Sequence, residues 1–162
     1  MKIITRAEWG ARPPTKIVTV PWYKRTGFAV HYSGANKLQT VRSIQNYCMD
    51  VRGFSDIDYN FLADYKGNLY EGRGWMNRGS HILDHNTENI GVCAIGVDAD
   101  ITPVQMDAIR WLYDEANRRK RGILSKRTHR GVTGKTSCPG DRLAAWVAAG
   151  MPHDFLKMSD WK

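Results

Sequence analysis

The sequence predicts an α/β (α+β) fold, in which a central mixed β-sheet of about five or six strands carries about three α-helices on its faces. Short apolar segments rich in strand-forming residues alternate with segments of helical periodicity, which predicts this class. The chain has 162 residues, enough for one hydrophobic core without disulfide support. No Gly/Ser-rich or Pro-rich stretch marks a linker. We therefore expect residues 1–162 to form a single domain.

Five segments have the composition of strands. Residues 26–32 form a short apolar run, and residues 126–129 are expected to form another short strand. Residues 59–65 and 69–71 flank a Lys-Gly-Asn turn, which predicts an antiparallel hairpin. Residues 89–97 are apolar with little alternation, as expected of a strand that is covered on both faces. We place this last segment in the middle of the sheet.

Three segments have the periodicity or composition of helices. Apolar residues recur at spacings of three and four over residues 39–52, and Gly53 follows as a stop. Residues 103–121 begin after a Thr N-cap with a first-turn proline, and we expect Gly122 to end this helix. Residues 141–149 are expected to form the third helix. The basic run at the end of the second helix is interpreted as a solvated helix terminus, where the helix dipole favours cations.

The composition is basic, with 24 Lys and Arg against 16 Asp and Glu. The resulting positive field attracts anionic partners, but it does not distinguish nucleic acid, anionic lipid and acidic wall polymers. Residues 1–9 contain no apolar segment of signal-peptide length. No run approaches the ~20 apolar residues that a membrane span requires. We therefore expect no membrane insertion.

The histidines and cysteines provide candidate metal ligands. Zn(II) favours imidazole nitrogen and thiolate sulfur, and a catalytic zinc keeps three protein ligands. His31, His129 and Cys138 fit this requirement, although spacing alone selects no particular set among five histidines and three cysteines. His31 is equally consistent with a hydrogen-bonded histidine at a strand end. Cys48 and Cys93 lie on apolar faces, where a free cysteine behaves as a small hydrophobic residue.

Several motifs then occur together in a characteristic order. They are VHYSG (30–34), DYNFLADYKGNLYEGRGW (58–75), GSH (79–81), HN (85–86), NIGVC (89–93) and HRGVTGKTSCPGD (129–141), preceded by IITRAEWGARPP (3–14). In this arrangement the chain resembles peptidoglycan recognition proteins and the amidase-type phage lysozymes. The similarity extends over residues 3–146 and leaves 147–162 as a C-terminal tail. No separate cell-wall-binding domain is visible.

The resemblance implies a zinc-dependent N-acetylmuramoyl-L-alanine amidase. Such an enzyme hydrolyses the amide between the lactyl group of N-acetylmuramic acid and the L-alanine of the stem peptide in peptidoglycan. By motif, His31, His129 and Cys138 are the ligands of one catalytic zinc ion, and Tyr59 lies beside the water at that metal. Non-catalytic relatives typically have another residue in place of Cys138, so its presence favours a hydrolase.

The resemblance also implies residues around the metal. A second hydrogen-bond donor is expected two residues before the cysteine, where this chain has Thr136, with Lys135 adjacent. Which of the two stabilises the transition state stays open. Four residues match positions that line the substrate channel of relatives, although each could equally be a surface or packing residue; they are Trp75, His81, His85 and Asn86.

The expected setting is that of a phage or prophage endolysin. Such an enzyme is made in the host cytoplasm without a signal peptide and reaches the wall after holin-type release. Its expected partners are the muropeptides of peptidoglycan and acidic wall polymers that the basic surface attracts, with no nucleic acid, and we expect a monomer. A non-hydrolytic peptidoglycan-binding or regulatory protein on the same fold, or a secreted antibacterial amidase effector, are the alternatives.

Overall fold

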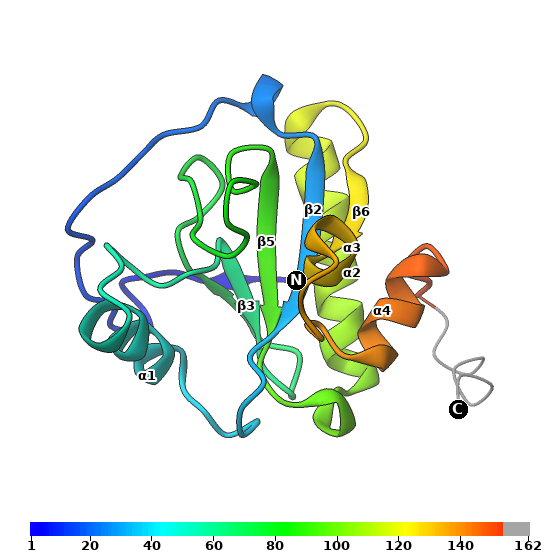
Figure 1. The fold of residues 1–162 in the computed structure, drawn as a ribbon, viewed down its shortest axis with the longest axis horizontal. Coiled ribbons are helices and arrows are strands. Elements are labelled where there is room, and N and C mark those ends of the chain that lie inside the picture. Colours follow the sequence, from blue (N-terminus) through cyan, green and yellow to red (C-terminus); the bar gives the residue numbers. More distant parts are fainter. Residues whose placement is uncertain (154–162) are drawn as a thin grey trace.

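The computed structural model describes residues 1–153, so residues 154–162 of the expected tail lie outside the description. A six-stranded sheet runs through the molecule in the order β1-β4-β3-β5-β2-β6. Figure 1 labels four of its neighbouring strands, β3, β5, β2 and β6. Only β3 and β4 pair antiparallel, and the other neighbours are parallel. The strands are β1 (Ile3–Ile4), β2 (Gly27–Tyr32), β3 (Phe61–Ala63), β4 (Leu69–Glu71), β5 (Asn89–Ala94) and β6 (Ser125–Thr128).

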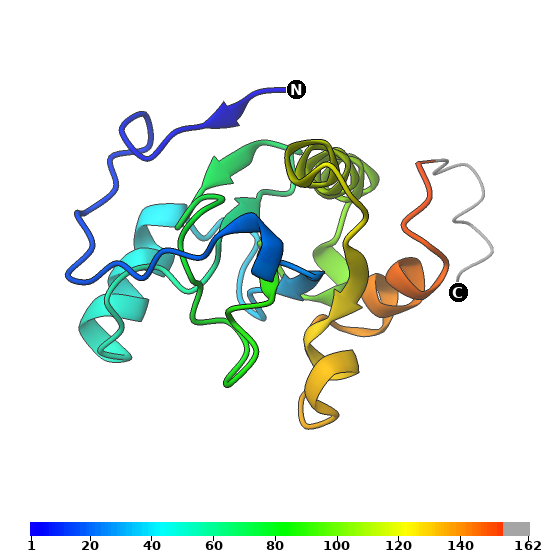
Figure 2. The same cartoon turned by 90° about the horizontal axis from the view of Figure 1, so that it is seen from above.

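Helices lie on both faces of the sheet. Figure 2 shows α2 on one side and both α1 and α3 on the other. None of the helices within residues 1–153 is long and apolar enough to cross a membrane. The helices are α1 (Val41–Asn46), α2 (Pro103–Lys120), α3 (His129–Thr133) and α4 (Asp141–Ala148), with short 3-10 turns η1 (Trp22–Lys24) and η3 (Asp98–Asp100) and a π-helical segment η2 (Tyr47–Val51).

Two hydrophobic clusters hold these layers together. Alternate residues of the central strands point to opposite faces, so that Phe28 and Val30 join the cluster under α2 and α4. Leu62, Cys93 and Ile95 belong to the second cluster, under α1. The α2-side cluster is the larger one, and the thinner α1 side leaves the sheet face near the end of β2 available for polar side chains.

The structure confirms the predicted fold class, the hairpin of β3 and β4 and the central position of β5. The expected helix over residues 39–52 is instead divided into α1 and the π-helical η2. The 103–121 helix ends one residue early, because Arg121 rather than Gly122 adopts the left-handed conformation, with φ 56°. The strand expected over residues 126–129 runs from Ser125 to Thr128, and His129 begins α3, which the sequence did not predict.

Candidate metal centre

His31 comes from the penultimate position of β2 and points to the α1 side of the sheet. It is 1% exposed and pairs in register with Cys93 of β5. Its neighbours Val30 and Phe28 face α2, so the period of two residues places the imidazole on the opposite face. Burial lowers the pKa of His31 well below its ordinary value, which keeps the imidazole neutral, as a metal ligand must be.

His129 and Cys138 reach the same face from α3 and the loop behind it. Thr128 caps α3 by accepting a hydrogen bond from the backbone N–H of Gly131, so His129 begins a helix rather than ending a strand. The loop after α3 returns to this helix, where the N–H of Arg130 donates to the carbonyl of Cys138 at 2.9 Å. These contacts bring His129 and Cys138 to one point.

The three side chains form a set that can hold a metal ion. One donor atom from each of His31, His129 and Cys138 lies within 4.8 Å of the others. Sγ of Cys138 is 3.6 Å from Nδ1 of His31, and tetrahedral Zn–N and Zn–S bonds would place such atoms roughly 3.3–3.6 Å apart. Burial raises the pKa of Cys138 to about 11, so metal binding would displace the thiol proton.

Tyr59 lies beside this set, with its ring centroid 5.3 Å from that of His31. Burial raises the pKa of Tyr59 well above its ordinary value. The hydroxyl therefore stays protonated at neutral pH and is available as a hydrogen-bond donor.

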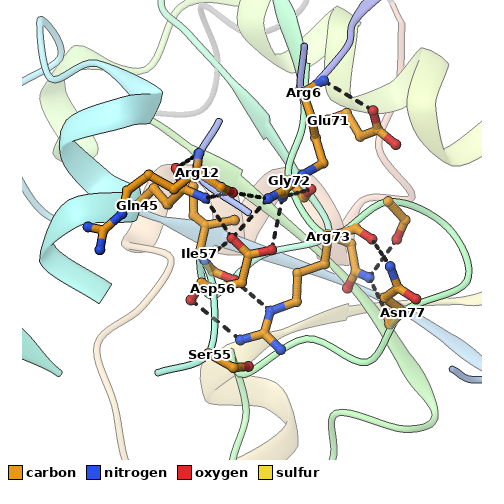
Figure 3. A network of polar contacts seen from close by, with 12 residues as sticks. Arg6, Arg12, Gln45, Ser55, Asp56, Ile57, Glu71, Gly72, Arg73 and Asn77 are labelled. Carbon is orange, nitrogen blue, oxygen red and sulfur yellow. Dashed lines mark hydrogen bonds and ion pairs between the residues drawn. The ribbon is translucent and has the colours of Figure 1, made fainter. Parts of the chain in front are cut away.

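A polar network fixes the segment that leads to Tyr59 (Figure 3). The buried Asp56 carboxylate is held by Arg6 Nη1 at 2.9 Å and by Gln45 Nε2 at 2.7 Å. Arg73 donates from Nε to the carbonyl of Ile57 at 2.7 Å, and its backbone N–H donates to the carbonyl of Tyr59 at 2.9 Å. The N-terminal segment and the loop after β4 thus position Tyr59 from a distance.

His81 and Asn86 lie in the loop between β4 and β5. His81 is 6% exposed, and its Nδ1 lies 2.9 Å from Nε2 of His31. Burial lowers the pKa of His81 to about 3. The Oδ1 of Asn86 accepts hydrogen bonds from the backbone N–H groups of His81 and Ile82. The structure therefore places His81 behind His31, and Asn86 stabilises the loop that carries His81.

His85 lies farther out, and Trp75 is not brought to the site. The Nδ1 of His85 is 2.7 Å from Glu88 Oε1, and both residues line a cavity of about 690 Å³ between this loop, β6, α3 and α4. Trp75 packs at 4.3 Å between ring centroids against Phe61 of the α2-side cluster, and Arg119 lies over its ring. These contacts are on the face of the sheet away from His31.

Thr136 and Lys135 differ in how they relate to Cys138. Thr136 is partly buried, and its Oγ1 accepts a hydrogen bond from the backbone N–H of Cys138 at 3.1 Å, which leaves the hydroxyl proton free to donate. Lys135 is exposed.

A second cavity of about 310 Å³, lined by Ser33, Tyr59 and Asp58 among others, opens on the other side of the site.

Sequence reasoning missed three residues that shape this region. Arg73 holds both the Tyr59 segment and, through its Nη2, the hydroxyl of Ser80 beside His81. Gly79 and Gly91 provide the space that the His81 ring occupies. A glycine inside a strand, such as Gly91, is a signal for close approach of another group. The arginine carries no comparable signal, because its partners are mostly backbone carbonyls.

A mixed sheet with two histidines, a cysteine and a tyrosine gathered on one face defines an α/β protein with a candidate metal-binding site. The sequence profile described as N-acetylmuramoyl-L-alanine amidase matches residues 22–141, more than half of the chain. The chain belongs to this amidase family, and the resemblance seen in the motifs is confirmed at that level.

Curated relatives include peptidoglycan recognition proteins and amidases. Peptidoglycan-recognition protein SC2 of Drosophila melanogaster is 32% identical over 171 residues, covering 99% of this chain and 88% of the relative. The N-acetylmuramoyl-L-alanine amidase of Sus scrofa is 34% identical over 159 residues, covering 85% of this chain but 25% of that longer protein.

Solved structures of recognition proteins share the fold. Drosophila PGRP-LB superposes with a TM-score of 0.80 at 26% identity, over 94% of this chain and 95% of that one. Peptidoglycan recognition protein LE, solved with tracheal cytotoxin, a monomeric diaminopimelic acid-type peptidoglycan, gives a TM-score of 0.80 at 27% identity, over 93% and 94% of the two chains.

Proposed function

We propose that this chain is a zinc-dependent N-acetylmuramoyl-L-alanine amidase, which hydrolyses the amide between the lactyl group of N-acetylmuramic acid and the L-alanine of the stem peptide. The observation that carries the proposal is the convergence of His31, His129 and Cys138 on one point. Two nitrogens and one sulfur are donors that Zn(II) prefers, and three protein ligands leave a position open for catalysis.

The side chains around this point supply the remaining chemistry. A bound zinc ion acts as a Lewis acid and lowers the pKa of water to ~7. Tyr59 is held protonated by burial, and Thr136 has a hydroxyl proton that its contact with Cys138 does not use. Both can donate hydrogen bonds to the carbonyl oxygen of the scissile amide, which gains negative charge as the bond is attacked.

Two cavities could take the substrate. One is lined in part by Tyr59, and the other is lined in part by Thr128, directly before His129. A muropeptide has two arms, glycan and stem peptide, that leave the scissile amide in opposite directions. We place one arm in each cavity. That proteins such as PGRP-LE are solved with a muropeptide supports this class of substrate.

The decisive experiment is incubation of the purified, zinc-loaded protein with peptidoglycan sacculi, with and without a chelator, followed by mass spectrometry of the new ends. The expected products are free stem peptides that begin with L-alanine, released only without chelator. If the protein binds sacculi but releases no such peptides, the alternative is favoured: a non-hydrolytic recognition or regulatory protein. Several relatives are named as recognition proteins, which agrees with that alternative.

The biological setting stays a prediction. A phage or prophage endolysin would lyse host cells only when co-expressed with a holin, whereas a secreted antibacterial effector would act on neighbouring cells without one. The formal charge of +8 supports loose attachment to acidic wall polymers. Activity on whole walls should then fall steeply as salt rises from 0.05 to about 0.5 M, because salt screens exposed charges.

A further inference from the structure

Both ring nitrogens of His31 face a specific partner. Nδ1 lies 3.6 Å from Sγ of Cys138, and Nε2 lies 2.9 Å from Nδ1 of His81. If Nδ1 is the metal-binding atom, the proton of the neutral imidazole resides on Nε2 and points at His81. His81 then accepts at Nδ1 and carries its own proton on Nε2. The two rings meet nearly edge to face, at 84°.

We propose that His81 is a positioning residue, which fixes the tautomer and the ring orientation of His31 for metal binding. This inference rests on the proposed function, because it takes His31 to be a zinc ligand. A hydrogen bond to the second nitrogen of a ligand histidine typically changes metal affinity by about 10–100-fold. His81 is buried at 6% exposure, so it supports the ligand rather than offering a surface to substrate.

The structure holds the His81 ring in a narrow slot. A Cβ atom built on Gly79 would lie 2.4 Å from the ring, and one built on Gly91 would lie 2.5 Å from it. Both glycines therefore keep space for this imidazole. Oδ1 of Asn86 accepts from the backbone N–H of His81 at 2.7 Å, which fixes the backbone from which the ring extends.

A buried cation secures the end of the same loop. Arg25 is 0% exposed, and its Nη1 donates to the carbonyls of Asn86, Thr87 and Asn89 at 3.0 Å each. The slot, the Asn86 contact and these bonds give His81 one position. By contrast, no hydrogen bond within residues 1–153 involves the ring of His129, which is placed by the backbone of α3.

The test compares two amides at position 81. His81→Asn puts an acceptor oxygen near the position of Nδ1, whereas His81→Gln carries the same amide one methylene farther out. Zinc dissociation constants are measured by competition with a chromophoric chelator, and His153→Asn serves as the matched histidine control. We expect affinity to fall about 10–100-fold in His81→Gln and less than about fivefold in His81→Asn, with no change in the control.

Two further readouts separate positioning from simple destabilisation. Urea unfolding of the metal-free proteins should show similar stability for the two amide variants, and the visible spectrum of the Co(II) form should change in His81→Gln but not in His81→Asn. Gly79→Ala, which pushes the ring aside without removing it, should weaken zinc binding in the same direction.

Two results would refute the positioning role of His81. Equal zinc affinity in the wild type and His81→Gln would refute it, and so would equal losses in both amide variants that follow their metal-free stability. A wild-type protein that binds no zinc would instead refute the proposed function.

Discussion

Nδ1 of His31 lies 3.6 Å from Sγ of Cys138, although 107 residues separate the two in sequence. The contact joins the end of a central strand to a loop near the C-terminal helix. Together with His129, this pair of donor atoms forms a group that could hold a metal ion.

Replacing Cys138 by alanine should abolish the stabilisation of the fold by zinc. With free zinc at 1,000 times its dissociation constant, the wild-type free energy of unfolding should rise by about 4 kcal/mol, because only the folded state presents the assembled ligands. Calorimetry with and without chelator measures this. Cys48→Ala, a matched buried cysteine outside the site, should lower stability yet keep the full zinc-dependent gain. A zinc gain that survives in Cys138→Ala would contradict the ligand assignment.

Thr136→Ala should lower kcat by about 100-fold, the scale for loss of one donor to a developing oxyanion. Thr136→Ser keeps the hydroxyl and should retain most of the activity. Lys135→Ala should change kcat less than about threefold, because Lys135 is exposed and its side chain makes no hydrogen bond within the described residues. Steady-state rates on soluble muropeptide measure these changes in kcat. A larger loss of kcat in Lys135→Ala than in Thr136→Ala would assign the donor to Lys135.

Arg25→Met should destabilise the protein by about 3–5 kcal/mol, since it leaves several buried carbonyls without a donor. Those carbonyls belong to Asn86 and Thr87 of the loop before β5, to Asn89 at the start of β5, and to Asn77, whose carbonyl accepts from Nη2 at 2.7 Å. Burial lowers the pKa of Arg25 to about 10, so the guanidinium is charged at neutral pH. Urea unfolding gives the measurement, and Lys24→Met, at an exposed neighbour, should stay within about 0.5 kcal/mol of wild type. A loss below about 1 kcal/mol would show that water satisfies these carbonyls.

Asp58→Asn should stabilise the protein at neutral pH but not in acid. Burial raises the pKa of Asp58, and its Oδ1 has no hydrogen-bond partner. The folded state then binds the proton more tightly than the unfolded chain, so ionisation costs stability above the folded pKa, and this cost is absent below the unfolded value of about 3.9.

We expect a gain of about 1 kcal/mol at pH 7, the lower end of the cost of an unsatisfied buried group, that disappears near pH 3. Urea unfolding of the metal-free protein at several pH values measures it. Asp84→Asn, in an exposed loop, should show no such pH-dependent difference. A difference that grows toward acid would reverse the sign and disprove the interpretation.

The strands were predictable where burial leaves a strong pattern. The apolar runs that became β2 and β5 are covered on both faces, so most of their residues are apolar or small. The boundary between β6 and α3 was not predictable to the residue, because it depends on the hydroxyl of Thr128 capping Gly131 rather than on hydrophobic periodicity. The π-helical segment after α1 likewise has the same apolar spacing as a regular helix.

The sequence by itself supplied the chemical groups, which its motifs nominate by family resemblance: two histidines and a cysteine with zinc-type donors, and a tyrosine. It also predicted the order of the central strands and the longer helices, but not β1 or α3, which carries His129. Only the tertiary structure decided that His81 lies behind His31 while Trp75 packs on the other face of the sheet. The physical reason is that loops are positioned largely by bonds to backbone carbonyls, as at Arg25 and Arg73, and a carbonyl is present at every residue. Side-chain patterns therefore reveal which groups a site contains, and the folded loops reveal how those groups meet.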